Sequence, residues 1–134
     1  MRVFLDTNVL VSAFATRGLC ADLLRHVLVE HELVVGEVVI AELKRVLTQR
    51  LEVPRPPVDE IERLLRDHEV VHKPRAHLKL GLDDPNDEWV VASASAGEAD
   101  VLVTGDADIL SAADRIPMPV LSPRGFWNHL RDRN

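Results

Sequence analysis

The sequence has one cysteine, no long apolar run and fewer basic than acidic residues, and each of these shortages excludes a class of protein. Cys20 alone can form neither an internal disulfide nor a thiolate cage for a metal. No apolar stretch reaches the ~18 residues that a transmembrane helix needs, and the first residues lack the basic and then apolar pattern of a signal peptide. We therefore expect a cytoplasmic protein with no membrane partner.

The charge balance is acidic, with 16 Lys and Arg against 22 Asp and Glu and a formal net charge of -6. This balance argues against a simple nucleic-acid-binding module, whose affinity comes from basic side chains that neutralise phosphates. It remains compatible with an enzyme that gathers carboxylates around divalent cations, because a bound metal reverses the charge locally. The placement of the acids decides between the two.

Several motifs are also missing. The six histidines show neither ligand spacing nor an HExxH segment, so we interpret them as scattered surface residues. No GxGxxG or Walker pattern is present, which leaves a nucleotide cofactor without support. We interpret Cys20 as a core residue, and Trp89 and Trp127 as packing residues rather than base-stacking platforms.

What the sequence does contain is an alternation of short apolar runs with segments of helical periodicity. At 134 residues, 46% of them hydrophobic, the chain is long enough for one core and too short for two, so we expect one domain over residues 1–134. Strands are predicted at 3–5, 33–35, 70–71, 101–103 and 119–121. Helices are predicted at 8–14, 19–30, 37–50, 58–68, 86–97 and 123–131, with a helix-to-helix turn at Pro54–Pro57. This alternation predicts an α/β fold with a mostly parallel sheet.

Two acids directly follow predicted strands. Asp6 comes after the apolar run 3–5, and Asp106 follows the run 101–103 after Thr104 and Gly105. In open parallel sheets, functional groups collect beyond the carboxyl ends of the strands, where the strand order reverses. Neighbouring strands lie only ~4.8 Å apart, so acids at adjacent strand ends can share one ion.

Each candidate acid also has a purely structural interpretation. Asp6 precedes a predicted helix and can serve as its N-cap. Glu42 lies at the edge of the apolar stripe of its helix, where ordinary surface glutamates also occur. Asp87 belongs to an acid-rich first helical turn, which the helix dipole favours, although it is the acid there best placed to face inward. Asp106 or Asp108 can cap the short turn that follows, and we favour Asp106 as the metal ligand and Asp108 as an accessory one.

The combination of these acids is more informative than any one of them. Carboxylates that converge in one pocket repel each other and raise each other's pKa. Hard divalent ions such as Mg²⁺ or Mn²⁺ prefer oxygen ligands and offset that repulsion. Such ions also generate a hydroxide nucleophile for phosphoryl displacement, so no Ser, Cys or His nucleophile is required.

Four segments, in matching order and spacing, resemble PIN-domain nucleases: Val3–Ser12, Val38–Leu43, Asp84–Ala94 and Ala99–Asp108. They extend over nearly the whole chain. The triplet Asp-Thr-Asn at 6–8 is a weak signal alone, whereas four segments in order are specific. The resemblance is closest to the toxin–antitoxin branch of the family.

This resemblance implies a five-stranded, mostly parallel sheet flanked by helices and a ribonuclease that needs Mg²⁺ or Mn²⁺ and leaves a 5′-phosphate. It implies homodimers and an antitoxin protein that blocks the site. The four acids that match the family's metal site are Asp6, Glu42, Asp87 and Asp106. Asn8 and Thr104 would be supporting residues that orient carboxylates or water. We expect Glu42 to act either as a ligand or as the base for the attacking water.

Basic residues around the acids are candidates to attract the RNA backbone: Arg17, Arg45, Arg50, Lys73, Arg75 and Arg124. Two alternative functions stay open. One is a PIN-like module that binds RNA or a protein without cutting. The other is a phosphatase of the haloacid-dehalogenase type, whose Asp-x-Asp segment is approached by Asp106-Ala107-Asp108 but not by Asp6-Thr7-Asn8.

Overall fold

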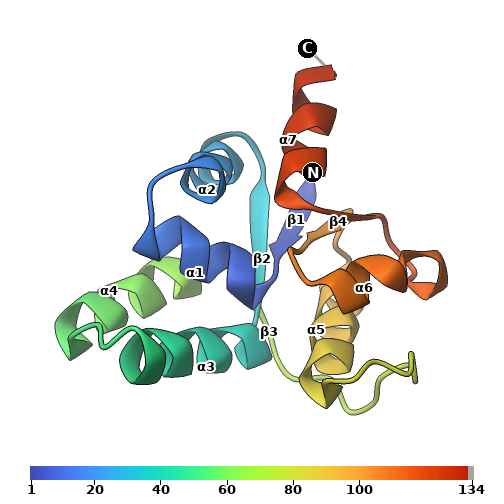
Figure 1. Ribbon diagram of the computed structural model, residues 1–134, viewed down its shortest axis with the longest axis horizontal. Helices are drawn as coiled ribbons and strands as arrows, with labels where there is room; N and C mark the ends of the chain where they lie inside the picture. The colour runs from blue at the N-terminus through green and yellow to red at the C-terminus, as the bar shows by residue number, and fades with distance from the viewer. Residues whose placement is uncertain (133–134) are drawn as a thin grey trace.

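The computed structural model describes residues 1–132 and contains one five-stranded sheet (Figure 1). The strand order is β3-β2-β1-β4-β5, and every neighbouring pair is parallel. The strands are β1 (Arg2–Leu5), β2 (Glu32–Gly36), β3 (Glu69–Val71), β4 (Val101–Val103) and β5 (Val120–Leu121). The expected α/β fold with a five-stranded parallel sheet is confirmed.

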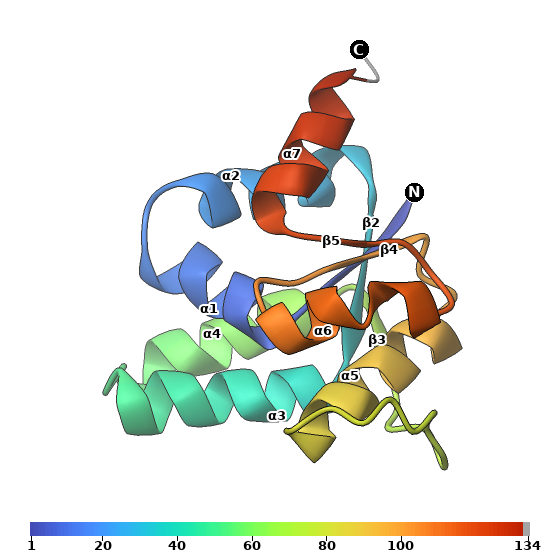
Figure 2. The same ribbon diagram turned by 45° about the vertical axis from the view of Figure 1, so that its right-hand side comes forward.

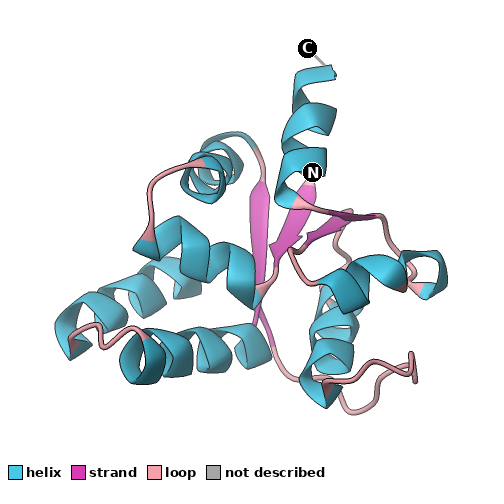
Figure 3. Ribbon diagram, in the orientation of Figure 1, coloured by secondary structure: helices cyan, strands magenta, loops and turns pink. Residues whose placement is uncertain are grey.

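Helices cover both faces of this sheet, as the secondary-structure colours of Figure 3 show. One group contains α1 to α4, and α5 and α6 lie on the other side of the strands (Figure 1). Within residues 1–132, no helix is both long and apolar enough to cross a membrane. The helices are α1 (Thr7–Ala15), α2 (Leu19–Glu30), α3 (Glu37–Arg45), α4 (Arg55–Arg66), α5 (Pro85–Ala96), α6 (Ala107–Ser111) and α7 (Pro123–Asp132).

The central strand β1 and its neighbour β4 are buried on both faces. Val3, Phe4 and Leu5 of β1 are at most 1% exposed, and the three residues of β4 are at most 3% exposed. This burial explains why both strands are continuous apolar runs rather than alternating ones. Cys20, expected in the core, is half-buried and packs against the core's edge.

Three local predictions were wrong. The helix predicted over 37–50 ends as an α-helix at Arg45 and continues as a π-helical turn, η1 (Val46–Arg50). Pro54–Pro57 is not a turn between helices, because Pro54 is the N-cap of α4 and the next two prolines lie in its first turn. Proline is tolerated there because the first N–H groups of a helix have no acceptor within it. A short turn was expected after Asp106, where the chain forms α6 and then a 3₁₀ turn, η2 (Ala113–Arg115).

Candidate active site

The strand order reverses between β1 and β4, and two acids lie at that point. Asp6 follows β1 directly, and Asp106 lies three residues beyond the end of β4. The Asp6 N–H donates to the carbonyl oxygen of Val103 at 2.9 Å, so the hydrogen bonding between the two strands continues to this edge. The reversal of a parallel sheet opens a crevice at the carboxyl ends of its strands, which is where ligands bind in such folds.

Asp6 uses its two carboxylate oxygens differently. Oδ1 accepts from the Thr7 N–H at 2.7 Å and caps α1, so the N-cap interpretation is correct. Oδ2 accepts from the Thr104 hydroxyl at 2.7 Å. The side chain is buried, at 4% exposure, and burial raises its pKa, as do the charges of Asp106 and Asp84, whereas the two hydrogen bonds lower it.

The segment after β4 is fixed against α1 by its neighbours. The Thr104 hydroxyl, which donates to Asp6, also accepts from the Asp106 N–H at 3.0 Å. The Asn8 Oδ1 accepts from the Gly105 N–H at 3.2 Å. The structure therefore places Thr104 and Asn8 where they orient the chain that carries the acids, and their predicted supporting role in catalysis stays a prediction.

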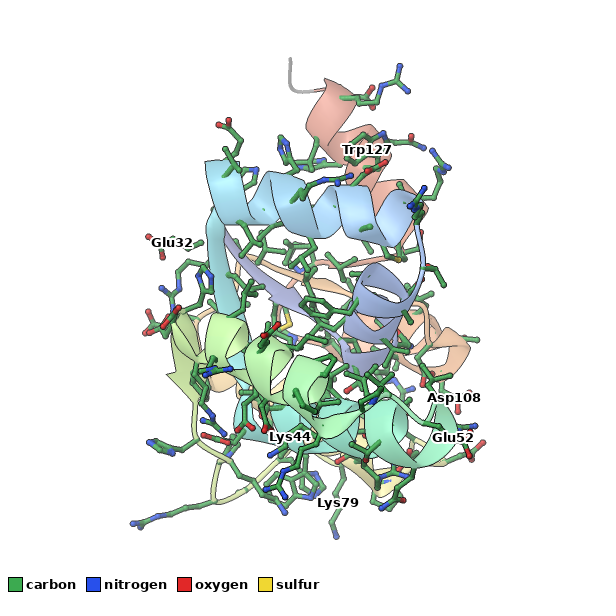
Figure 4. All side chains as sticks on the ribbon, turned by 90° about the vertical axis from the view of Figure 1, so that its left-hand side faces the viewer. Glu32, Lys44, Glu52, Lys79, Asp108 and Trp127 are labelled. Atoms are coloured by element: carbon green, nitrogen blue, oxygen red, sulfur yellow. The ribbon has the colours of Figure 1, made fainter. Side chains whose placement is uncertain are left out.

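Asp106 caps α6 with one oxygen, Oδ1, which accepts from the N–H groups of Asp108 at 2.8 Å and Ile109 at 3.3 Å. Its side chain also forms a hydrogen bond with Asp87, which contributes to the raised pKa of Asp87. Asp108, the predicted accessory ligand, is exposed, and it contributes to this arrangement through its backbone N–H rather than its carboxylate. It lies on the outside of the molecule in Figure 4.

Asp87 faces inward from the first turn of α5, as expected. It is only 8% exposed, and burial raises its pKa to about 7, together with the charges of Asp106 and Asp6. The N-cap of α5 is Asp84, whose Oδ1 accepts from the Asn86 N–H at 2.9 Å. Carboxylates from three separate parts of the chain thus act on each other at one edge of the sheet.

Glu42 joins this group from α3. It is half-buried, and burial and then the charge of Asp6 raise its pKa. The Asn86 side-chain amide donates to Glu42 Oε2 and ties the start of α5 to α3. Glu42 is therefore on the same side of the sheet as Asp6.

Two residues of this site were not singled out from the sequence. Asn86 holds Glu42, and the charge of Asp84 raises the pKa of Asp6, Glu42 and Asp87. Both lie in the acid-rich turn at the start of α5, which was attributed to the helix dipole from the sequence alone. The number of acids in that turn was the signal that could have pointed to them. Within residues 1–132, no group of three or more His, Cys, Asp or Glu side chains is placed so that it could hold a metal ion.

A sequence model of the PIN domain matches residues 2–108. The chain belongs to the PIN-domain family. No curated protein sequence matches it. The four acids of this PIN domain all lie within the matched range.

Solved structures share the PIN fold of this chain at low sequence identity. VapBC2 from Rickettsia felis, bound to a DNA fragment from their promoter, has a TM-score of 0.66 at 19% identity, covering 91% of this chain and 98% of that one. VapBC-1 from nontypeable Haemophilus influenzae has a TM-score of 0.65 at 20% identity, covering 92% and 99%. FitAcB from Neisseria gonorrhoeae has a TM-score of 0.61 at 19% identity, covering 91% and 98%.

A hollow adjoins the acids of this PIN domain on one side of Glu42. This α3 hollow has a volume of about 680 Å³, and its lining includes Glu42, Arg45, Lys73 and Asn86. Figure 2 shows the segment between β3 and α5 running beside the start of α5. Of the six basic candidates, Arg45 and Lys73 line this hollow. Lys73 Nζ also lies 4.4 Å above the Trp89 ring, so this indole packs against other side chains, as expected.

Proposed function

We propose that this PIN domain is a metal-dependent endoribonuclease and the toxin of a toxin–antitoxin pair. The observation that carries the proposal is the meeting of Asp6, Asp87 and Asp106 at the switch point of the sheet, where the charge of Asp106 raises the pKa of both Asp6 and Asp87. Such a cluster is costly for the fold alone, since like charges in a poorly solvated site repel each other. Perturbed acids in a cleft are typical of functional sites.

The donor set fits a partly hydrated hard cation rather than a closed cage. Mg²⁺ is usually held by one or two carboxylates, with water and substrate phosphates in its other positions, so a cage of three protein ligands is not required. Asp6, Asp87 and Asp106 would hold one or two Mg²⁺ or Mn²⁺ ions through oxygen atoms, which such ions prefer. When bound, the ion supplies an activated water and neutralises charge on the phosphoryl group.

The remaining residues position RNA and protons. Glu42 is either a further ligand or the base that accepts a proton from the attacking water, a role that its raised pKa suits. Thr104 would orient the Asp6 carboxylate, and Asn8 would hold the backbone at Gly105 beside it. Arg45 and Lys73 offer positive charge to the RNA backbone beside the acids.

The likeness to VapBC2, VapBC-1 and FitAcB supports the partner part of the proposal. We assign this chain an antitoxin protein as its partner, RNA as its substrate, a homodimer as its assembly and the cytoplasm as its location. Copurification of the chain with the product of a neighbouring gene, and loss of RNA cleavage in that complex, would test the partner.

The nuclease itself is tested by incubating the purified protein with structured and unstructured RNA, with and without EDTA. We expect Mg²⁺-dependent cleavage that EDTA abolishes. Asp6→Asn should slow it at least about 100-fold, because the acids act as one unit. The matched control is Asp132→Asn, an exposed acid at the end of α7, which Figure 1 shows at the opposite end of the molecule from α3.

Equal cleavage by Asp6→Asn and wild type would refute the assignment. A protein that binds RNA but takes up no Mg²⁺ in a calorimetric titration would instead be a PIN-like module that does not cut, one of the two alternative functions left open by the sequence.

A further inference from the structure

A second hollow lies on the other side of Glu42 from the α3 hollow. This α1 groove has a volume of about 420 Å³ and separates α1 from the end of α3 and η1. Its lining includes Glu42 and Asn8, so it opens directly beside the acids. Because Glu42 lines both hollows, a chain lying across α3 can occupy the two at once with its middle at the acids.

The lining of the α1 groove combines apolar side chains of α1, the end of α3 and η1 with polar side chains of α1. Val11 and Ala15 face Val46 and Leu51 across it. Ser12, one residue along α1 from Val11, adds a hydroxyl. An apolar cleft with a few placed polar groups is the usual form of a site for a small organic ring system.

The π-helical turn η1 shapes one wall of the groove. The Leu51 N–H donates to the Val46 carbonyl oxygen at 3.1 Å, so the turn runs from residue i to i+5. This wider turn brings Leu51 back to the side of Val46, where both line the groove, and Leu51 remains 46% exposed. Turns of this kind occur frequently at functional sites.

Three polar groups at the groove lack partners among residues 1–132. The Asn8 amide oxygen accepts from Gly105, which leaves its NH₂ free to donate. The Arg50 guanidinium forms no ion pair in that range. The Thr7 hydroxyl is buried without a hydrogen-bond partner, although Thr7 lines the groove. Buried polar groups are nearly always satisfied, so an unsatisfied one beside a cleft points to a missing ligand or water.

We propose that the α1 groove binds one nucleobase of the RNA, next to the phosphate that is cut. The base would lie between Val11 and Val46, with the Asn8 amide and the Ser12 hydroxyl at its polar edge and Arg50 near its phosphate. The strand would continue past Glu42 into the α3 hollow, where Arg45 and Lys73 lie. A base enters such a groove only when it is unstacked, so the substrate is single-stranded RNA or a loop.

The base site rests on the proposed function, because RNA is its ligand. Nucleotide binding can nevertheless be measured separately from RNA cleavage. Each of the four nucleoside 5′-monophosphates is titrated into ¹⁵N-labelled protein with Mg²⁺ present. We expect the largest amide shifts in residues 7–16 and 46–51, with one base bound more tightly than the others. Ala15→Leu fills the groove and should weaken that binding about tenfold, a typical loss when a pocket no longer fits its ligand.

The matched control is Ala96→Leu, since Ala96 is likewise an exposed alanine in the last turn of a helix and lies outside the groove. It should bind each nucleotide as the wild type does. Ser12→Ala, which removes one hydroxyl, should change the preferred base, so the test does not depend on Ala15→Leu alone.

Shifts confined to the α3 hollow, or equal affinities for wild type, Ala15→Leu and Ser12→Ala, would overturn the base site. Nucleotide binding in the groove by a protein that cleaves no RNA would support the base site while removing the proposed function. Cleavage of RNA by a protein whose groove amides do not shift with any nucleotide would support the proposed function and overturn the base site.

Discussion

At the scale of single residues, the ionised Asp87 carboxylate is the group that most clearly destabilises the fold. Its pKa of about 7 results from burial and then from the charges of Asp106 and Asp6. Below about pH 3, well under the ordinary Asp pKa of about 3.9, the carboxyl is protonated in both the folded and the unfolded chain. As the pH rises toward 7, the unfolded chain loses this proton while the folded chain keeps it, so the free energy of unfolding falls. Above that pH the loss is complete.

We therefore predict that Asp87→Asn stabilises the metal-free protein at pH 8, on the order of 1–3 kcal/mol, and has little effect at pH 4. Urea unfolding in EDTA at the two pH values measures this. Asp132→Asn serves as the control and should leave the profile of the wild type unchanged. A wild-type stability that does not fall between pH 4 and pH 7 would show that Asp87 is not held in a repulsive site.

Thr104 is the residue that connects the two strand-end acids. Thr104→Val removes its hydroxyl at nearly constant volume, so Asp6 loses a hydrogen bond that lowers its pKa. We predict a cleavage rate about tenfold lower, in the range for a partner that orients a metal ligand. The acid limb of the pH–rate profile should move to higher pH, because the ionised form of Asp6 is now harder to reach.

Thr104→Ser keeps the hydroxyl and should restore both the rate and the acid limb. A Val variant with a slower rate but an unmoved acid limb would indicate a packing role only, since Thr104 is fully buried.

At the scale of elements, α4 is held to α3 by a small ion-pair network. The Arg66 guanidinium contacts both oxygens of Glu37, at 2.7 and 3.0 Å, and Glu62 at 2.9 Å. Lys44 adds a contact of 2.8 Å to Glu62. The hydrogen bond from Arg66 lowers the pKa of Glu37, and hydrogen bonds from Lys44 and Arg66 lower that of Glu62. This network steadies the helix that carries Glu42.

We predict that Arg66→Met reduces the free energy of unfolding by about 0.5–1 kcal/mol at pH 7, a modest amount because these side chains are partly exposed. Since the folded pKa values of Glu37 and Glu62 lie below 4.5, the contribution is present above that pH and is lost as the pH falls further. It should also shrink in 1 M salt.

Arg63→Met, at an exposed position of the same helix, is the control and should change little. A loss for Arg66→Met that persists at low pH and high salt would mean that the long side chain acts through packing.

The parts of the fold that could be predicted are those that depend on residues close together in the sequence. The strands β1 and β4 are continuous apolar runs because both of their faces are buried. Asp6 and Asp106 come shortly after these strands in the sequence, so their place at the strand ends could be predicted. The π turn and α6 could not be predicted, because each depends on a few hydrogen bonds, such as those that Asp106 accepts in capping α6. The bond from Asn86 to Glu42 joins residues 44 positions apart and exists only once α3 and α5 are packed.

At the scale of the whole molecule, the two edges of the sheet differ in how their charges are matched. At the amino edge, Arg2 pairs with Glu32 at 3.0 Å and with Glu69, and donates to the Gly97 carbonyl oxygen, so charges of opposite sign join three strands and α5. At the carboxyl edge, the charges of Asp106 and Asp6 act on Asp87 and raise its pKa. The first arrangement stabilises the fold, whereas the second destabilises it and is typical of a site kept for function.

The end of the molecule that carries α7 lies away from the acidic site. Trp127 of α7 and Glu32 lie away from Lys44 of α3 in Figure 4. His26 and Trp127 pack edge to face, with ring centroids 6.3 Å apart. Substitutions at the far end of α7 are therefore suitable controls.

The most direct test of the shared acidic site is the Mg²⁺-dependent rate of RNA cleavage by Asp6→Asn, Asp106→Asn and the variant that carries both. If the two carboxylates serve one ion site, each single change removes nearly all activity and the double variant is no slower than the slower single one. Losses that multiply in the double variant, or a single variant that cleaves at the wild-type rate, would contradict a shared site.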